Sequence, residues 1–303
     1  MARIFAAADI GSNTAHLLIA ATDGDIVMRL DNINEWVPLG EIVAAQGEIP
    51  KAQADILVEA MKDFRRAAAG RKADRLYVFA TEAIRSAKNS RQVLQRINRE
   101  AGVSVEVITP AREAELSFIG TRLDGREAKA NLLFEVGGGS AQIASVDRAT
   151  IAVDTSLPLG TGRLISEAGL KQPCDESALK KAVEYIQQIL AETELPAVST
   201  PVAIASGGVA RGLWRALHPD GEKRLSREEI EYLIWATQRL TVETIIKRFS
   251  VKPKRAGTLL AGALVYQALL EKFGLDVITV SEFGVREGAV LEMLKKKNLG
   301  QDL

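Results

Sequence analysis

The sequence lacks the residues and stretches that several classes of protein require. Cys174 is the single cysteine, and His16 and His218 are the only histidines among 303 residues. One cysteine cannot form an intrachain disulfide, and these three residues cannot build a zinc site of the usual kind. No apolar run approaches the roughly 20 residues that a membrane-spanning helix needs, and the N-terminus lacks the form of a signal peptide. We therefore expect a cytoplasmic protein.

The sequence also has no excess of positive or negative charge. Lys and Arg total 39 residues and Asp and Glu total 39, so the formal net charge is zero. Such a chain has no global field that would draw it to DNA or to a membrane, and an anionic substrate has to be met by a local basic cluster. The apolar and charged fractions, 47% and 26%, are those of an ordinary globular protein, and the length allows two domains.

What the chain does have is a glycine turn between two apolar runs. The runs, residues 4–8 and 17–21, are typical of buried strands, so the segment between them must turn sharply. Backbone N–H groups in such a turn can close around a phosphate oxygen. Asp9, at the end of the first strand, could hold a divalent cation beside that phosphate. We predict Asp9 as a metal ligand and the turn as a phosphate site made by Gly11, Ser12, Asn13 and Thr14.

The same pattern occurs again at residues 131–143 and superposes on the first without gaps. Glu135 falls on Asp9, Gly137 on Gly11, and Gln142 on His16. The repeat predicts two like domains facing each other across a phosphate-filled cleft, and two unrelated hairpins are the alternative. It makes Glu135 a second candidate metal ligand. Further candidate phosphate-binding residues in this repeat are Gly137, Gly138, Gly139, Ser140 and Gln142.

The remaining elements follow from periodicity and from start and stop signals. Residues 226–229 form a capping box, and Ser206-Gly207-Gly208 is a third small-residue turn between a strand and a helix. Residues 36–50 and 156–162 are expected to be loops. Strands are expected at 26–30, 76–80, 103–108, 151–157, 202–205 and 277–281. Helices are expected at 51–69 (closed by Gly70), 93–101, from Pro110 onward, 176–194, about 255–273, and 284–297.

Five segments carry a resemblance to a known family. They are DIGSNT (9–14), ATEAIRSAKN (80–89), EVGGGSAQ (135–142), SLPLGTGRL (156–164) and SEFGVREG (281–288). In this order they resemble the exopolyphosphatase/guanosine pentaphosphate phosphohydrolase (Ppx/GppA) family of the actin-like ATPase superfamily, over essentially the whole chain. The resemblance implies an α/β fold of two actin-like (ribonuclease H-like) domains, with mixed sheets flanked by helices and a cleft between them. Domain I would be residues 1–120 joined by the C-terminal helix 287–303, and domain II would be residues 121–286.

The resemblance also implies an activity. The family's members release terminal phosphate from inorganic polyphosphate or guanosine pentaphosphate with Mg²⁺ or another divalent cation, and a homodimer is implied by the family alone. The additional helical domain and the His-Asp motifs of its long members are absent, so the chain is expected to be a short form. Glu113-Ala114 matches the family's catalytic glutamate, which makes Glu113 the residue that orients or deprotonates the attacking water. The alternative for Glu113 is compensation of a helix dipole.

Basic and small residues complete the expected phosphate site. Arg85 and Lys88, three residues apart after a buried strand, could share one face of a helical turn, and a solvated basic surface is the alternative. The resemblance favours phosphate binding by Arg85, and Gly207 and Gly208 supply another small-residue turn. Arg286 and Glu287 are expected to tie the last helix to the hinge between the domains.

Three residues depart from the family's pattern. Glu135 stands where the family has aspartate, Gln142 where it has glutamate, and Glu115 where arginine usually follows the Glu-Ala pair. These differences leave open a non-catalytic sensor that binds (p)ppGpp or polyphosphate. A third interpretation, an actin-like sugar or acid kinase, agrees less well with the segments outside the glycine turns.

Overall fold

The computed structural model describes residues 2–125, 130–147, 150–218 and 221–303. Contacts between residues divide the chain into two compact units. Unit 1 consists of Met1–Leu123 and Phe283–Leu303, and unit 2 is Asp124–Glu282. Among the described helices, none is both long enough and apolar enough to cross a membrane.

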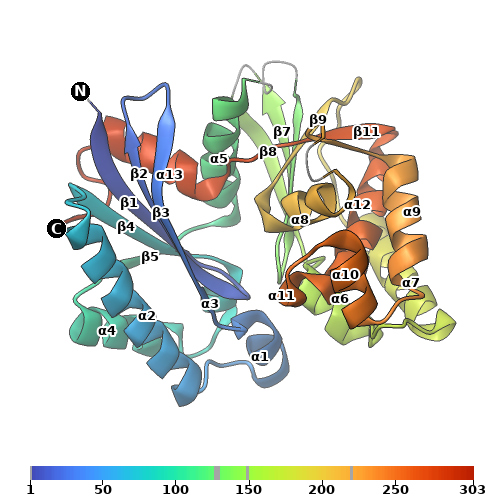
Figure 1. The fold of residues 1–303 in the computed structure, drawn as a ribbon, viewed down its shortest axis with the longest axis horizontal. Coiled ribbons are helices and arrows are strands. Elements are labelled where there is room, and N and C mark those ends of the chain that lie inside the picture. Colours follow the sequence, from blue (N-terminus) through green and yellow to red (C-terminus); the bar gives the residue numbers. More distant parts are fainter. Residues whose placement is uncertain (1, 126–129, 148–149, 219–220) are drawn as a thin grey trace. The chain divides into compact units, whose positions relative to one another are not determined.

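The core of unit 1 is a mixed sheet in the order β12-β4-β1-β2-β3, with β5 paired to β4 (Figure 1). Strand β2 is antiparallel to both β1 and β3, whereas β4 is parallel to β1 and β5 is parallel to β4. The strands are β1 (Arg3–Ile10), β2 (Thr14–Thr22), β3 (Val27–Trp36), β4 (Arg75–Ala80), β5 (Val105–Val107) and β12 (Gln301–Asp302).

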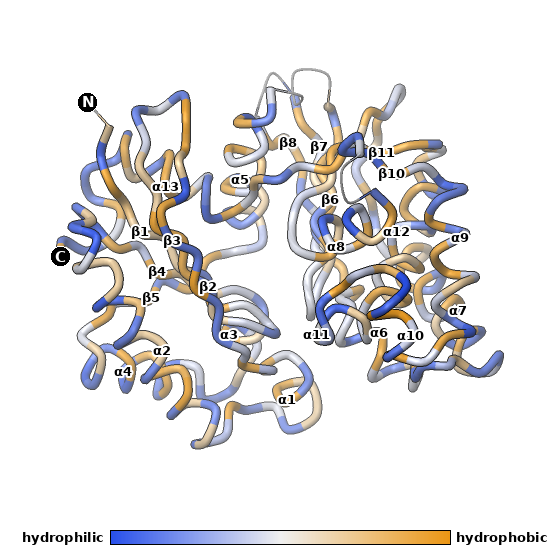
Figure 2. The backbone as a smooth tube through the Cα atoms, in the orientation of Figure 1, coloured by the Kyte–Doolittle hydropathy of each residue, from blue (hydrophilic) through white to orange (hydrophobic). Residues whose placement is uncertain are grey.

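Helices cover both faces of this sheet. They are α1 (Leu39–Gln46), α2 (Lys51–Gly70), α3 (Glu82–Ser86), α4 (Ser90–Ala101), α5 (Pro110–Thr121) and α13 (Val285–Lys295), with a 3₁₀ turn η1 (Arg122–Asp124). One face packs against α2 and α4, and the other packs against α5 and α13. Because both faces are buried, β1 and β4 are almost continuously apolar, and Figure 2 shows β1 as a largely hydrophobic stretch.

Unit 2 is built on a second mixed sheet, in the order β10-β11-β9-β6-β7-β8. Its strands are β6 (Leu132–Val136), β7 (Ala141–Asp147), β8 (Thr150–Leu157), β9 (Ala203–Ser206), β10 (Arg224–Ser226) and β11 (Val277–Val280). Its helices are α6 (Thr161–Ala168), α7 (Glu176–Glu192), α8 (Gly207–Leu217), α9 (Arg227–Thr237), α10 (Val242–Phe249), α11 (Pro253–Ala256) and α12 (Leu259–Phe273). The predicted capping box is present, since Ser226 and Glu229 each accept a backbone N–H of the other.

The repeat found in the sequence is a repeat of architecture. In unit 1 two hairpins join β1, β2 and β3, and β4 lies parallel to β1; in unit 2 β6, β7, β8 and β9 have the same arrangement. The register also agrees, because Asp9 lies opposite His16 and Glu135 lies opposite Gln142. The gapless superposition of the two segments is therefore confirmed.

Several sequence predictions about elements were wrong. The expected loop at 36–50 contains helix α1, and β3 continues to Trp36 instead of ending near residue 30. Helix α1 has eight residues, of which only Leu39 and Val43 are buried, so its sequence shows no helical repeat of apolar residues. The expected end of α2 at Gly70 is confirmed, and Lys72, two residues later, has the left-handed φ of 55°.

The expected single helix at 255–273 is also wrong. Pro253 begins the short helix α11, and Thr258 then donates its N–H to the carbonyl of Arg255, three residues earlier. This tight turn separates α11 from α12, which starts at Leu259. Helix α10 and strand β12 were not predicted; β12 has two residues, too few for an alternating pattern.

Candidate functional site

The glycine turn of unit 1 is a closed hairpin turn. Gly11 donates its N–H to the carbonyl of Thr14 at 2.9 Å. The carbonyl oxygens of Ser12 and Asn13 accept hydrogen bonds from Gly40 (2.6 Å) and Val37 (3.0 Å), which follow β3. Because these carbonyls are held by the segment after β3, the N–H side of the turn is the side suited to an anion.

The turn of unit 2 is built in the same way. Gly137 donates its N–H to the carbonyl of Ser140 at 2.8 Å. The carbonyls of Gly137 and Gly138 accept from Thr161 (2.9 Å) and Gly162 (2.8 Å), at the start of α6. The carbonyl of Gly139 accepts from Nε of Arg163 at 3.1 Å. The predicted phosphate residues 11–14 and 137–140 thus form one turn in each unit.

Two glycines that sequence reasoning missed make these contacts possible. A Cβ on Gly40 would lie 2.7 Å from Cβ of Ser12, and a Cβ on Gly160 would lie 2.3 Å from backbone atoms of Gly139. A side chain at either position would push the supporting segment away from the turn. The signal was present, because Val37-Pro38-Leu39-Gly40 and Leu157-Pro158-Leu159-Gly160 are nearly identical and follow equivalent strands.

Asp9, the predicted metal ligand of unit 1, is the last residue but one of β1, with 9% of its surface exposed. Its carboxylate pairs with the guanidinium of Arg286 on α13. The next residue, Glu287, pairs with Arg29 on β3 at 2.9 Å and accepts the N–H of Gly284. In unit 1, Arg286 and Glu287 therefore bind the last helix to β1 and β3, and the carboxylate of Asp9 is already shared with a cation.

Glu82 is a second carboxylate at this turn, and sequence reasoning did not select it. Ser12 donates its hydroxyl to Oε2 of Glu82 at 3.1 Å. Thr81 donates its N–H to the carbonyl of Ile10 at 3.1 Å, which brings the start of α3 beside the turn. The signal was the position of ATEAIR directly after the buried strand β4, because β4 is parallel to β1 and ends at the same edge of the sheet.

Glu113 lies in the first turn of α5 and is partly buried. Pro110 opens the helix as expected, and Thr109 caps it by accepting the N–H of Arg112. Helix α5 is packed very closely on α13, because a Cβ on Gly288 would lie 1.8 Å from the carbonyl oxygen of Leu116. The catalytic role of Glu113 stays a prediction, on a helix that is firmly held against the helix carrying Arg286.

Glu115, one of the departures from the family's pattern, has a local partner. It is exposed and forms an ion pair with Arg112 at 2.6 Å, and Arg112 also pairs with Glu292 on α13. Burial disfavours the charge on Arg112, but the two carboxylates outweigh it and raise the pKa of this guanidinium. The pair of Arg112 with Glu292 binds α5 to α13, and Glu115 is a second partner of the same guanidinium within α5.

Arg85 and Lys88 are not on one helical face, which corrects the sequence prediction. Helix α3 ends at Ser86 and Ala87 is extended, so the two side chains leave different segments. Arg85 donates from Nη1 to the carbonyl of Ile108 at 2.7 Å. Lys88 is exposed, and its side chain lies close to Gly47, since a Cβ built on this glycine would be 3.3 Å from Nζ of Lys88. Phosphate binding by Arg85 stays a prediction, with one of its nitrogens already bound to the protein.

The second strand-end carboxylate, Glu135, lies opposite Gln142. Gln142 is 2% exposed, and its Nε2 donates to the hydroxyl of Ser140 at 3.0 Å, which fixes the last residue of the turn. Beneath them Tyr266 is fully buried; burial and the negative charge of Glu135 raise the pKa of its hydroxyl. Gln142 is thus a buried residue that holds the turn through its hydrogen bond to Ser140.

Gly207 and Gly208, the third small-residue turn, lie beside Glu135. Gly207 has φ +89°, a backbone conformation that favours glycine, and a Cβ there would lie 3.2 Å from Oε1 of Glu135, so a side chain would crowd this carboxylate. A Cβ on Gly208 would lie 2.6 Å from a terminal nitrogen of Arg255. Unit 2 therefore brings together Glu135, Gln142, this turn and a cation.

The donors present are those that Mg²⁺ prefers. Asp9 and Glu135 offer carboxylate oxygens beside the turns, and Mg²⁺ takes one or two protein carboxylates and completes its shell with water and phosphate. Within the described parts of the chain, no three or more His, Cys, Asp or Glu residues gather as a metal cluster. The chemistry of each carboxylate suits Mg²⁺, Arg286 already pairs with Asp9, and metal binding by Asp9 and Glu135 stays a prediction.

Comparison with known proteins identifies the family of the chain. The model of the Ppx/GppA phosphatase family matches residues 18–297. Exopolyphosphatase 1 of Mycobacterium tuberculosis is 30% identical, over 97% of this chain and 89% of that protein. The guanosine-5'-triphosphate,3'-diphosphate pyrophosphatase of Photobacterium profundum is 24% identical, over 97% of this chain and 60% of that protein.

A solved structure extends the likeness to the fold. The Ppx/GppA family member of Aquifex aeolicus is 27% identical and superposes with a TM-score of 0.81, over 98% of this chain and 99% of that one. The mixed sheets flanked by helices are those of the actin-like fold. The fold and the match over most of the sequence show that this chain is a hydrolase and belongs to the Ppx/GppA phosphatase family.

Proposed function

We propose that the protein releases terminal phosphate from inorganic polyphosphate, from guanosine pentaphosphate, or from both. The observation that carries the proposal is the repeated arrangement of a carboxylate at a strand end followed by a glycine turn. Asp9 precedes Gly11–Thr14, Glu135 precedes Gly137–Ser140, and the register of the two hairpins is the same. The names of two relatives, an exopolyphosphatase and a guanosine-5'-triphosphate,3'-diphosphate pyrophosphatase, support these two substrates.

Binding of the terminal phosphates is assigned to backbone N–H groups of the turns and to nearby cations. Hydrolysis of a phosphoanhydride requires little covalent chemistry from the protein, because most of the catalysis is charge neutralisation and positioning. The turns are held in shape by the segments after β3 and β8. The N–H groups of Gly11 and Gly137 are bonded within the turns, so the phosphate donors that we assign are the N–H groups of the residues that follow these glycines. Arg85 in unit 1 and Arg255 in unit 2 are the cations that we assign to this task.

Glu113 is assigned to the attacking water. Its carboxylate orients the water and accepts its proton as the water oxygen bonds to the terminal phosphorus and the bond to the bridging oxygen breaks. The products are orthophosphate and a chain or nucleotide shorter by one phosphate. The close packing of α5 on α13 supports the assignment, because a general base must be held in position.

Asp9 and Glu135 would hold Mg²⁺. The bound ion would neutralise charge on the phosphate oxygens as the anhydride bond breaks. Arg286 pairs with Asp9, so an ion bound at Asp9 would have to share this carboxylate with the guanidinium. We also infer a cytoplasmic homodimer, the location from the free Cys174 and the dimer from the family.

The test is phosphate release from polyphosphate of defined length and from guanosine pentaphosphate, with and without Mg²⁺. We expect release from at least one of them, dependent on Mg²⁺ and lost in Glu113→Gln. Tight binding of either anion without release would favour the sensor instead. Transfer of phosphate to a sugar or acid acceptor would favour the kinase.

A further inference from the structure

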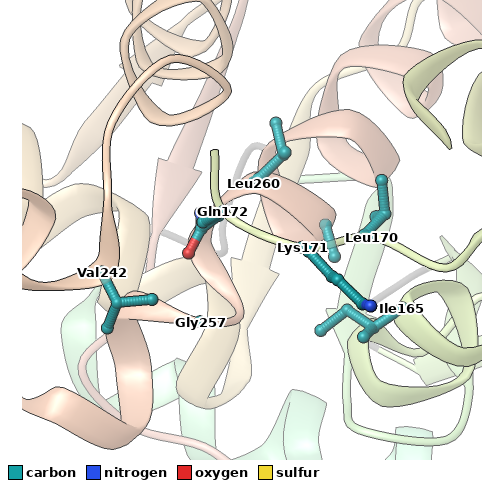
Figure 3. Close-up of a pocket in the computed structure, with 8 residues that line it drawn as sticks. Ile165, Leu170, Lys171, Gln172, Val242, Gly257 and Leu260 are labelled. Carbon is teal, nitrogen blue, oxygen red and sulfur yellow. The ribbon is translucent and has the colours of Figure 1, made fainter. Parts of the chain in front are cut away.

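Unit 2 contains a cavity of about 280 Å³ that includes none of the predicted site residues. Figure 3 shows the side chains that line it, which come from α6, the segment after α6, α10 and α12. Its wall is mostly apolar and is formed by Ile165, Leu170, Val242, Leu260 and Ala261. A concave apolar wall of this kind favours burial of a small apolar body.

Two neighbouring residues give the cavity its polar character. Gln172 lines it, and both polar atoms of its side chain are buried without a hydrogen-bond partner among the described residues. A buried amide in that state is costly, and native proteins rarely leave one unexplained. Lys171 is exposed and extends its ammonium beside Ile165, on another side of the cavity from Gln172 (Figure 3).

We propose that this cavity is a binding site for a small carboxylate with an apolar or aromatic body and a hydroxyl or amide at its far end. The carboxylate meets Lys171, the body lies on the apolar wall, and the far group exchanges hydrogen bonds with the amide of Gln172. The volume is at the lower end of the range for ligand sites, so the ligand has roughly ten non-hydrogen atoms. The site is distinct from the phosphate turns and does not depend on the proposed activity.

The cavity shares its supporting elements with the glycine turn of unit 2. Gly257, on its lining, directly follows helix α11, whose Arg255 lies against Gly208. Helix α6, which supplies Ile165, begins at Thr161, whose N–H is bonded to the carbonyl of Gly137. A bound ligand therefore also stabilises the segment that holds the turn. Slower hydrogen exchange in this segment would show that the ligand binds in the cavity.

The probe is 4-hydroxyphenylacetate, with phenylacetate lacking the hydroxyl and tyramine carrying an ammonium in place of the carboxylate. Binding is measured by titration followed by NMR. We expect the probe to bind with millimolar or better affinity, phenylacetate about fivefold more weakly, and tyramine not measurably, since one hydrogen bond changes affinity by roughly two- to tenfold. Hydrogen exchange at residues 161–172 should slow when the probe is bound.

Four variants assign the contacts. Lys171→Gln should weaken the probe about fivefold, whereas Lys180→Gln, on the exposed face of α7, should not. Gln172→Leu should abolish the preference for the probe over phenylacetate and raise the melting temperature, because it removes an unpartnered buried amide. Gln188→Leu, whose amide is exposed and bonded to Glu192, should do neither. Absence of probe binding, equal binding of tyramine, or a probe affinity unchanged in both site variants would overturn the proposal.

Discussion

The guanidinium of Arg286 pairs with the carboxylate of Asp9, which lies 277 positions earlier in the chain. Both side chains are largely buried, at 13% and 12% exposed. The carboxylate that ends β1 is therefore neutralised by the protein's own cation. A divalent cation at this position would have to share Asp9 with Arg286 or displace it.

Replacing Arg286 by glutamine should expose this competition. The change leaves the buried carboxylate of Asp9 without its partner, so the free energy of unfolding should fall by about 3 kcal/mol. Millimolar Mg²⁺ should restore part of the loss, because an ion that binds only the folded state stabilises it. Denaturation with and without Mg²⁺ measures both quantities. The control is Arg29→Gln, which breaks the neighbouring pair with Glu287. The stability that this variant loses should not be restored by Mg²⁺. Equal restoration of stability by Mg²⁺ in the two variants would exclude Asp9 from the metal site.

Glu113→Gln should lower kcat by roughly 10²- to 10⁴-fold, the usual contribution of a positioned general base. Binding of polyphosphate should persist, because the change removes a negative charge from an anion site. Glu115→Gln is the matched control on the same helix, since Glu115 is exposed and paired with Arg112. It should keep nearly full turnover. An unchanged kcat in folded Glu113→Gln would move the catalytic role to another residue.

Gln142→Glu tests the departure in the second turn. If position 142 helps to place the metal or the water, the carboxylate should raise activity or sharpen the dependence on Mg²⁺, whereas inhibition would show that the new charge repels phosphate. Gln142 is 2% exposed and hydrogen-bonded to Ser140. Because burying a charge is costly, the Gln142→Glu variant should be less stable than the original protein when Mg²⁺ is absent. Kinetics and melting curves across a Mg²⁺ titration measure both effects. No change in either would place Gln142 outside the working site.

The sequence predicted the two hairpins and their register because an apolar run, an acid, a glycine turn and a second apolar run occur in the same order near the N-terminus and again at residues 131–143. It missed α1 because a helix of eight residues with two buried side chains has no measurable period. It joined α11 to α12 because the apolar pattern of α12 was extended back to Arg255, across a turn formed by backbone atoms.

The parts of the candidate site that were missed depend on topology. Glu82 reaches Ser12 only because β4 is parallel to β1 and the two strands end at the same edge. Arg286 reaches Asp9 only because α13 packs against that sheet after the chain has passed through unit 2. Gly40 and Gly160 could have been found, since the segments that contain them repeat each other. Glycine is needed there because another part of the chain approaches closely, and the sequence alone does not show this approach.

Gly288→Ala should disrupt the packing that holds Glu113. The new methyl group would lie 1.8 Å from the carbonyl oxygen of Leu116, so α5 and α13 must separate. Such overpacking should cost about 3 kcal/mol of unfolding free energy and lower kcat more than it raises KM. Gly70→Ala, in open space at the end of α2, should be neutral or slightly stabilising. Equal stability of the two variants would show that the helices can separate without cost.

The last prediction concerns the length of the polyphosphate that is processed. A long chain is held by many dispersed basic contacts, each a charge-assisted attraction that salt weakens. This protein has no net charge, and the cations that we assign to phosphate are Arg85 and Arg255. One nitrogen of Arg85 is already bonded to Ile108, and Arg255 lies against Gly208. Such a site should hold only the terminal few phosphates.

We therefore expect kcat/KM to fall little as polyphosphate is shortened to a few units, with release of the chain between successive cuts. Arg85→Ala should raise KM for short and long chains alike, and Arg91→Ala, on the exposed side of α4, should leave both unchanged. The measurement is the distribution of product lengths over time from a long polyphosphate of one size. Gradual shortening of the whole population is expected because each cut is followed by dissociation. Full-length chains persisting beside free phosphate, without intermediates, would mean that the protein holds far more of the chain than these cations explain.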